Sequence, residues 1–258
     1  AGIDLFGSLI ENSGVVNIGN ANNENVASDG GVFQIFGGTV KIAGCYYSSD
    51  INTLAKFTIS GGTLTLPTSG STSTTIAPFQ IDGVGSTFNM SGGTVIIERK
   101  GGGGSNLGYT VTGVTNSAVT GGTLQIGDAS TPAAQTIEIN SSCRVGNLLV
   151  NSANATALLT TNSLLVTQNI TIASGILNAN NLNFTLGGNW INNSTFTPGT
   201  GTVIFSNATG QTISGSVVTA FRNLTIDDGS GVTLALNTSV AGTLTFVAGV
   251  INTGTNKV

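Results

Sequence analysis

Acid–base chemistry has few residues to draw on in this chain. Histidine is absent, which removes Ser-His-Asp and Cys-His nucleophile arrangements and the commonest metal ligand. A glycosidase needs two facing carboxylates, and a β-helical lyase needs an acidic calcium cluster with a basic residue. No acidic position recurs from repeat to repeat to build either one, so we expect no catalytic residues and no enzyme. The candidate carboxylates are Asp50, Asp82, Glu98, Asp128, Glu138, Asp227 and Asp228.

One pair of carboxylates could bind a metal. Asp227 and Asp228 precede Gly229, and paired carboxylates in a loop suit calcium. The favoured interpretation is an Asp-Gly turn with exposed carboxylates, because the matching segment at Asn151 and Ser152 carries no charge. We expect no cofactor, with calcium at this pair as the alternative.

Four aromatic residues could stack on sugar rings: Tyr46, Tyr47, Tyr109 and Trp190. Aromatic side chains also fill cores, and this is the favoured role for Trp190 in its Gly-Gly-Asn-Trp motif. In a strand, either Tyr46 or Tyr47 must face outward, so an exposed ring beside Cys45 is expected.

Charge is scarce. The chain of 258 residues has 7 basic and 11 acidic side chains and a net charge of -4, so a nucleic-acid surface is not expected. The densest basic pair, Arg99-Lys100 beside Glu98, has the pattern of solvated surface. No apolar run is long enough for a transmembrane helix, and no signal peptide is visible at Ala1.

A short motif recurs four times in the first half and predicts how the chain folds. An alternating strand meets a Gly-Gly pair and a second alternating strand follows, with Phe57, Ile59, Leu64 and Leu66 facing inward in one copy. One copy can bury little alone, so the copies must stack. The motif threonines are separated by 24, 31 and 29 residues: Thr39, Thr63, Thr94 and Thr123.

Two functional questions depend on this spacing. Rows of threonine, such as Thr63 and Thr65, could bind ice, but spacings this uneven are expected to prevent a flat face. Cys45 and Cys143 are 98 residues apart, about four coils or about 19 Å along a stack, so we expect no disulfide between them.

The second half has a longer repeat of about 75 residues, which we expect to span about three coils. Gln135–Ile137 returns at 211–213, Asn147–Val150 at 223–226, and Val166–Asn178 at 240–252. Because both halves share a Gly-Thr-apolar motif, residues 1–120 and 121–258 are interpreted as one all-β parallel β-helix with irregular coil lengths. We expect about nine to twelve coils.

The segments Asn181–Asn193, Phe196–Phe205, Gly210–Gly215 and Phe221–Ile226 resemble repetitive cell-surface proteins of Bacteroidetes. These adhesin-like proteins, gliding adhesins among them, are exported by the type IX secretion system. The resemblance covers about residues 120–258. It implies a β-helix, an extracellular or bacterial cell-surface location, and a role in adhesion or display, and it brings no catalytic residues.

The sequence therefore predicts a non-enzymatic structural or adhesive rod of a large surface protein. Its expected partners are surface glycans or other cell-surface proteins. Two alternatives stay open: a carbohydrate-binding or carbohydrate-cleaving β-helix, and a self-assembling extracellular filament. The second repeat stops near Asn252, so we also expect a longer parent protein and end-to-end self-association of the isolated segment.

Overall fold

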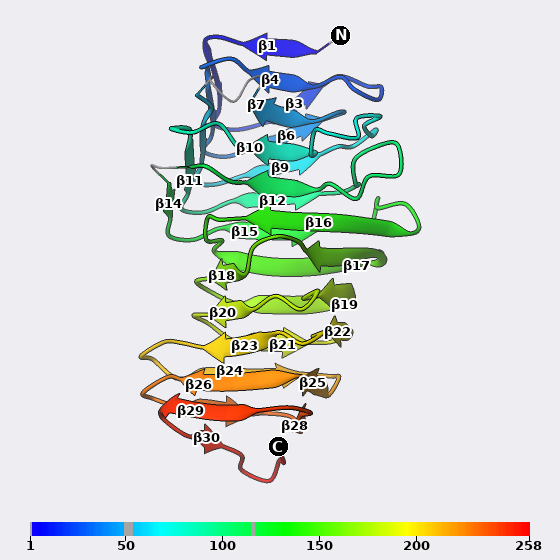
Figure 1. Cartoon of the computed structure of the whole chain (residues 1–258). Helices are drawn as coiled ribbons and strands as arrows, with labels where there is room; N and C mark the ends of the chain where they lie inside the picture. Colours follow the sequence, from blue (N-terminus) through cyan, green and yellow to red (C-terminus); the bar gives the residue numbers. More distant parts are fainter. Residues whose placement is uncertain (1, 49–53, 115–116) are drawn as a thin grey trace.

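The computed structural model describes residues 2–48, 54–114 and 117–258. All regular secondary structure in these residues is β-strand, and the strands pair in parallel. The chain winds through about 11 coils from the N-terminus at one end of the stack to the C-terminus at the other (Figure 1). The predicted parallel β-helix is confirmed.

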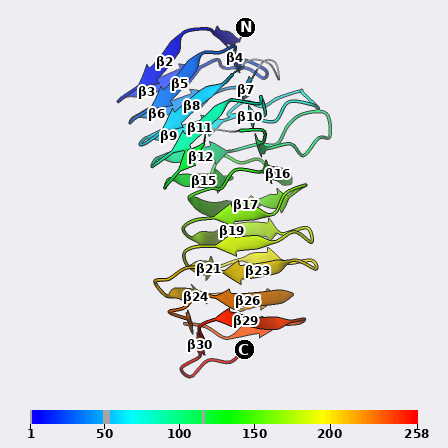
Figure 2. The ribbon, with the colours of Figure 1, turned by 60° about the vertical axis from the view of Figure 1, so that its left-hand side comes forward.

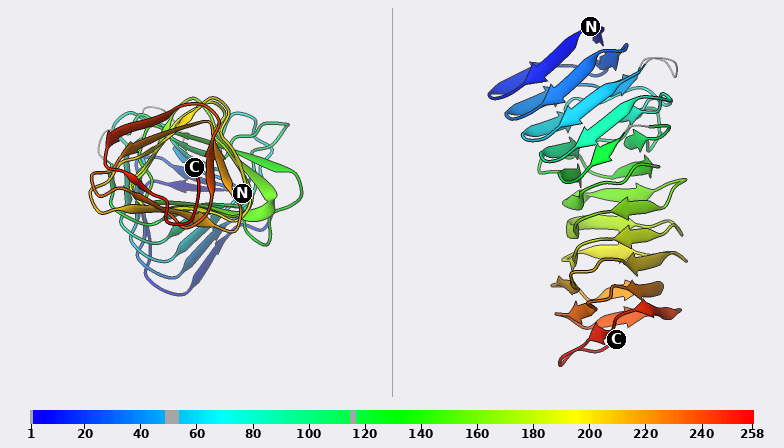
Figure 3. Two further views of the ribbon diagram at one scale, coloured as in Figure 1. Left: turned by 90° about the horizontal axis from the view of Figure 1, so that it is seen from below. Right: turned by 90° about the vertical axis from the view of Figure 1, so that its left-hand side faces the viewer.

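Each coil has three faces, which the chain visits in a fixed order, and the stack is three-sided in end view (Figure 3, left). The first face consists of β2 (Ser8–Glu11), β5 (Val32–Ile35), β8 (Lys56–Ile59), β11 (Thr87–Met90), β14 (Ala118–Val119), β18 (Leu164–Val166), β20 (Phe184–Leu186), β23 (Thr202–Phe205), β26 (Asn223–Asp227) and β29 (Leu244–Ala248).

The second face follows after a tight corner, and its strands succeed one another down the stack in Figure 2. It consists of β3 (Val15–Ile18), β6 (Thr39–Ile42), β9 (Thr63–Leu66), β12 (Thr94–Ile97), β15 (Thr123–Ile126), β17 (Asn147–Leu159), β19 (Ile170–Asn178), β21 (Trp190–Asn192), β24 (Gln211–Gly215), β27 (Val232–Leu234) and β30 (Ile251–Asn252).

The third face completes the coil. The long strands β17 and β19 bend around the corner into it, so the second and third faces form one sheet of 18 strands. The third face also contains β1 (Ile3–Leu5), β4 (Val26–Ser28), β7 (Tyr46–Ser48), β10 (Phe79–Ile81), β13 (Tyr109–Val111), β16 (Gln135–Ser141) and β22 (Thr195–Thr197) of this sheet. Its last two strands, β25 (Thr219–Phe221) and β28 (Thr238–Val240), pair as a separate two-stranded sheet.

The four Gly-Gly-Thr motifs stack at one corner, as predicted. Thr39 lies beside Thr63, Thr63 beside Thr94, and Thr94 beside Thr123 in direct register. The unequal spacing is absorbed in the loops between the second and third faces. The threonines therefore form a regular row despite the unequal spacing, and whether their face is flat stays a prediction.

Apolar side chains form continuous columns inside the stack. One column passes through nine successive coils, and every member is at most 3% exposed: Val40, Leu64, Val95, Leu124, Leu148, Ile170, Trp190, Ile213 and Leu234. Each member is covered by its neighbours above and below. Burial of this apolar surface is the main source of stability in such a stack.

Residues 1–120 and 121–258 share the large sheet, because β12 pairs with β15 and β15 with β17. The first face is divided instead. Its upper sheet ends at β14 and its lower sheet begins at β18. The change of style in the sequence thus coincides with a break in one face of a continuous solenoid. The strands of the upper coils are also tilted relative to those below (Figure 3, right).

The repeat of about 75 residues does not return to the same face. Asn147–Val150 lies on the second face, whereas its match at 223–226 lies on the first. Leu148 is followed down its column by Ile170, Trp190 and Ile213, which is three coils, and two further faces then lead to Leu224. The repeat therefore spans three coils and two further faces, which is two faces more than the expected three coils.

Asparagine side chains hold neighbouring coils together at the corners. The Oδ1 of Asn147 accepts the N–H of Asn169, and the Oδ1 of Asn169 accepts the N–H of Asn189, at 3.1 and 2.8 Å. Asn189 continues the ladder by accepting the N–H of Thr212 at 2.9 Å. These side chains satisfy backbone donors where the strand ladder is interrupted. Asparagine is thus abundant because its side chain bonds neighbouring coils at the corners.

Cys45 and Cys143 are both buried and both free. They lie in coils separated by several strand spacings, further apart than a disulfide can span.

Replacement of Gly93 by alanine tests the stacked corner. Gly93 has a φ of 69°, and an added Cβ would lie 2.7 Å from both the Gly61 carbonyl oxygen and the Ile59 Cγ1. Left-handed strain and this close approach should reduce the free energy of unfolding by about 2 kcal/mol or more. Gly229→Ala is the control, since nothing lies within 4 Å of its added Cβ. Equal urea midpoints for the two variants would contradict the stacked corner.

Candidate functional site

Three of the four aromatic candidates belong to the core. Tyr46 and Trp190 are 0% exposed and Tyr109 is 1% exposed. The ring of Phe79 lies between those of Tyr46 and Tyr109, at centroid distances of 5.4 and 5.3 Å. Trp190 packs on Phe196 and donates its Nε1–H to the Thr219 Oγ1 at 3.0 Å. These inward-facing rings leave no free face for a sugar, so Tyr46 and Tyr109 are not ligand-binding residues and the core role favoured for Trp190 is confirmed.

Tyr47 faces outward from the third face and is partly exposed, as the alternation of β7 predicts. It lies in a row with Ala27 and Gln80 of the adjacent coils. Burial raises the pKa of its hydroxyl, and the negative charge of Asp4 adds to this rise. A ligand-binding role for Tyr47 stays a prediction.

The proposed calcium pair is divided between two environments. Asp227 is partly exposed at the end of β26, whereas Asp228 is fully buried. The Oδ1 of Asp228 accepts the N–H of Ser230 at 2.8 Å, and its carbonyl accepts the N–H of Gly231. The Asp-Gly turn is present, but the expectation that both carboxylates are exposed is wrong for Asp228. No group of three or more acidic or cysteine side chains suited to a metal occurs in the described residues.

The other carboxylates are mostly dispersed. Asp50 lies outside the described residues. Asp82 accepts hydrogen bonds from the Ser48 hydroxyl and the Gln80 amide beside the third face, and Glu138 lies on β16. Glu98 and Asp128 are the exception, because they lie in successive coils at the corner where the chain leaves the second face.

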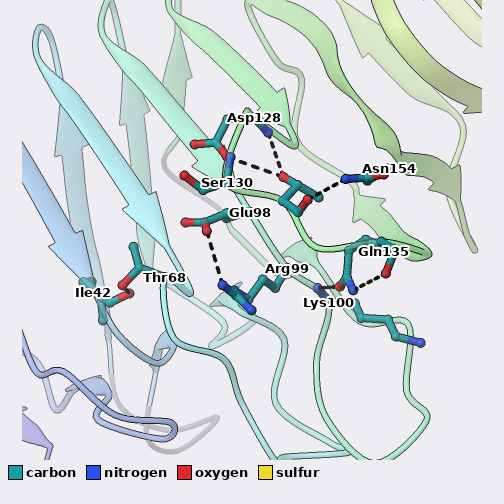
Figure 4. Close-up of polar contacts among 11 residues, drawn as sticks. Ile42, Thr68, Glu98, Arg99, Lys100, Asp128, Ser130, Gln135 and Asn154 are labelled. Carbon is teal, nitrogen blue, oxygen red and sulfur yellow. Dashed lines mark hydrogen bonds and ion pairs between the residues drawn. The ribbon is translucent and has the colours of Figure 1, made fainter.

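We name this region the charged corner and define it as Lys41, Glu98, Arg99, Lys100 and Asp128. Its register follows from the strands, since Ile97 of β12 pairs with Ile126 of β15. Glu98 follows the last residue of β12 and is in line with Gly127, whose neighbour is Asp128. Figure 4 shows Glu98, Arg99 and Asp128 at this edge.

Glu98 is only 4% exposed. Its Oε1 lies 3.7 Å from the Arg99 Nη2, which is an ion pair without a short hydrogen bond. The Nε of Arg99 is buried and has no hydrogen-bond partner among the described residues. This corner therefore contains a carboxyl group that is largely removed from water and a guanidinium that is 31% exposed and incompletely paired.

Loops of neighbouring coils are bonded to one another around this corner (Figure 4). The N–H of Lys100 donates to the Gln135 Oε1 at 3.1 Å, and the N–H of Gly102 donates to the Ser73 carbonyl at 2.8 Å. The glycine-rich loop at 101–104 is thus attached to the coil above. Asp128 closes a turn by accepting the N–H of Ser130 at 2.8 Å.

Burial raises the pKa of Glu98 from 4.5 to about 7. The negative charge of Asp128 adds to this rise, while Arg99 and Lys41 oppose it. Near neutral pH the corner therefore contains a carboxyl group that readily holds a proton. Carboxyl groups of this kind serve as proton donors or as pH-dependent binding groups.

Sequence reasoning found Glu98 and Asp128 only as separate candidates and treated the basic pair as solvated surface. The spacing of 29 residues between Thr94 and Thr123 could have related the two carboxylates. The same spacing places Glu98 beside Gly127, which precedes Asp128. The described residues enclose no pocket. Any ligand here would therefore be bound on the open wall of the solenoid.

No protein-family model, no curated protein and no solved structure matches this chain. The resemblance to Bacteroidetes surface proteins thus remains an expectation based on the motifs. Within the described residues there is no helix both long and apolar enough to cross a bilayer.

Both end coils expose apolar side chains. Phe6 and Val15 are 74% and 65% exposed near the N-terminus, and Val247 and Val250 are 66% and 56% exposed near the C-terminus. End-to-end self-association of the segment stays a prediction.

The raised pKa of Glu98 predicts a pH-dependent stability. Between about pH 4.5 and 7 the folded chain binds more protons at Glu98 than the unfolded chain. The Glu98 contribution to the free energy of unfolding should therefore fall as pH rises through this window and stay constant above it. Glu98→Gln should match the parent chain near pH 4.5 and melt a few degrees higher at pH 8, by circular dichroism.

Asp128→Asn is the companion variant, because asparagine keeps the oxygen that accepts the Ser130 N–H. Loss of its charge should move the Glu98 transition to lower pH. Identical pH profiles for the parent chain and Glu98→Gln would contradict this account.

Proposed function

We propose that this chain is a rigid, non-enzymatic structural and adhesive segment of a large bacterial surface or extracellular protein. The observation that carries the proposal is the uninterrupted core, in which one column of side chains passes through nine coils. Each coil is fixed by its neighbours, so the segment is expected to resist bending as a unit. At about 4.8 Å per coil, about 11 coils make a rod about 50 Å long.

The wall of the solenoid also suits display. With 7 basic and 11 acidic residues in 258, it is formed mainly of threonine, serine and asparagine. Loops between the second and third faces vary in length without disturbing the register of the strands. Such loops can present binding groups from a constant scaffold. In this proposal the partners are surface glycans or other surface proteins outside the cell.

A carbohydrate-cleaving role is the second candidate, and the charged corner is the observation that favours it. Glu98 with its raised pKa lies beside Asp128, and a pair of carboxyl groups with different proton affinities is what glycoside hydrolysis uses. The open wall and the absence of a pocket in the described residues favour the rod. Release of reducing ends from polysaccharides, abolished by Glu98→Gln, would favour the second candidate.

Small-angle X-ray scattering of the full chain, together with adhesion of chain-coated beads to bacterial surfaces, tests the proposal. We expect the scattering of a stiff rod, attachment of coated beads, and no attachment after thermal unfolding of the coat. A polysaccharide panel should yield no reducing ends. Flexible-chain scattering, or attachment that survives unfolding, would overturn the rod and adhesion proposal.

A further inference from the structure

Charge at the charged corner is not required by the fold. The positions that align with Glu98 in the adjacent coils are Pro67 and Gly127, since Ile97 pairs with Leu66 and Ile126. Uncharged residues therefore build the same corner one coil above and one coil below. On a chain that is only 7% charged, five charged residues gather here.

The basic groups of this corner have unused binding capacity. The buried Arg99 Nε has no acceptor, and the side chain is 31% exposed, so the guanidinium can still reach an external group. The Nζ of Lys100 donates to the Asn106 Oδ1 at 3.2 Å and has further donors.

The geometry fits a planar anionic group. A guanidinium presents paired N–H donors that match the two oxygens of a carboxylate. Asp128 uses its Oδ1 in the bonds with Ser130 and Thr131, and its other oxygen can accept a sugar hydroxyl. A residue that carries both a carboxylate and hydroxyl groups would satisfy both sides of the corner.

We propose that the charged corner binds an acidic sugar residue, with its carboxylate on the exposed part of the Arg99 guanidinium and its hydroxyl groups on Asp128. The proposal rests on the adhesive function proposed above and adds the class of glycan that is bound. The ligand is a uronic-acid-containing polysaccharide lying along the open wall.

Binding of such a ligand depends on the proton of Glu98. The charged groups that act on Glu98 are Asp128, Arg99 and Lys41. When Glu98 is ionised it competes for Arg99 and repels the sugar carboxylate. When it is protonated it releases Arg99 for the sugar carboxylate. Since the Glu98 pKa is about 7, binding should be tighter at pH 5.5 than at pH 8.5.

Calorimetric titration of the full chain with a galacturonate hexamer tests the proposal. The matched control ligand is the methyl-esterified hexamer, which keeps the sugar backbone and masks the carboxylates. Arg99→Gln is the test variant, and Arg222→Gln is the matched control because Arg222 is exposed at a different corner. We expect binding at pH 5.5 that is at least tenfold weaker in Arg99→Gln, unchanged in Arg222→Gln, and undetectable with the ester.

Glu98→Gln provides a second measurement that does not depend on the folding of the arginine variant. It should bind the hexamer equally at pH 5.5 and 8.5, whereas the parent chain should lose affinity at pH 8.5. Equal losses in both arginine variants, or equal binding of the ester, would overturn the site as nonspecific attraction. A preference for a sulfated oligosaccharide would overturn the uronate assignment.

Failure of this inference is distinguishable from failure of the proposed function. If the chain scatters as a rod and coated beads attach, but the hexamer does not bind, the acidic-sugar site is wrong and the adhesive rod remains. If the scattering is that of a flexible chain, the rod itself is wrong.

Discussion

The structure depends on one constraint, which is that every inward side chain must be covered by the coil above and the coil below. Parallel strand pairing fixes neighbouring coils about 4.8 Å apart. At that distance the residues in a column touch directly, so a polar or missing side chain would open the core of two neighbours at once. The column from Val40 to Leu234 satisfies this condition with aliphatic residues and one tryptophan.

The aromatic residues of the upper coils also lie in columns. Phe33, Phe57 and Phe88 lie in register on the first face, opposite Tyr46, Phe79 and Tyr109 on the third. Their ring centroids lie between 5.1 and 6.3 Å apart where they touch. Two aromatic columns from different faces thus interlock and fill the wide upper coils, which have the longest loops.

Corners follow a different rule, because the chain must turn while its backbone groups stay paired. Glycine allows the left-handed backbone at Gly62 and Gly93, where neighbouring backbone atoms leave no room for a Cβ. Asparagine then bonds one coil to the next, as in the ladder from Asn147 to Asn189. The corner between the second and third faces is the most permissive, and there the loops gather the charged residues of the proposed site.

The sequence alone determined the strand-corner-strand unit, the parallel β-helix, the stacked threonines and the unpaired cysteines, because these follow from local alternation and from strand spacing. Tertiary structure alone decided the face on which each segment lies. All three faces require the same alternation of inward apolar residues. The second copy of the repeat of about 75 residues can therefore lie two faces further along the coil than a whole number of turns would place it, and its residue pattern does not reveal this. Tertiary structure also decided that Tyr46 and Tyr109 are core residues and that Glu98 is buried beside Asp128. Loops of unequal length hide the register between coils, and burial at a corner depends on that register.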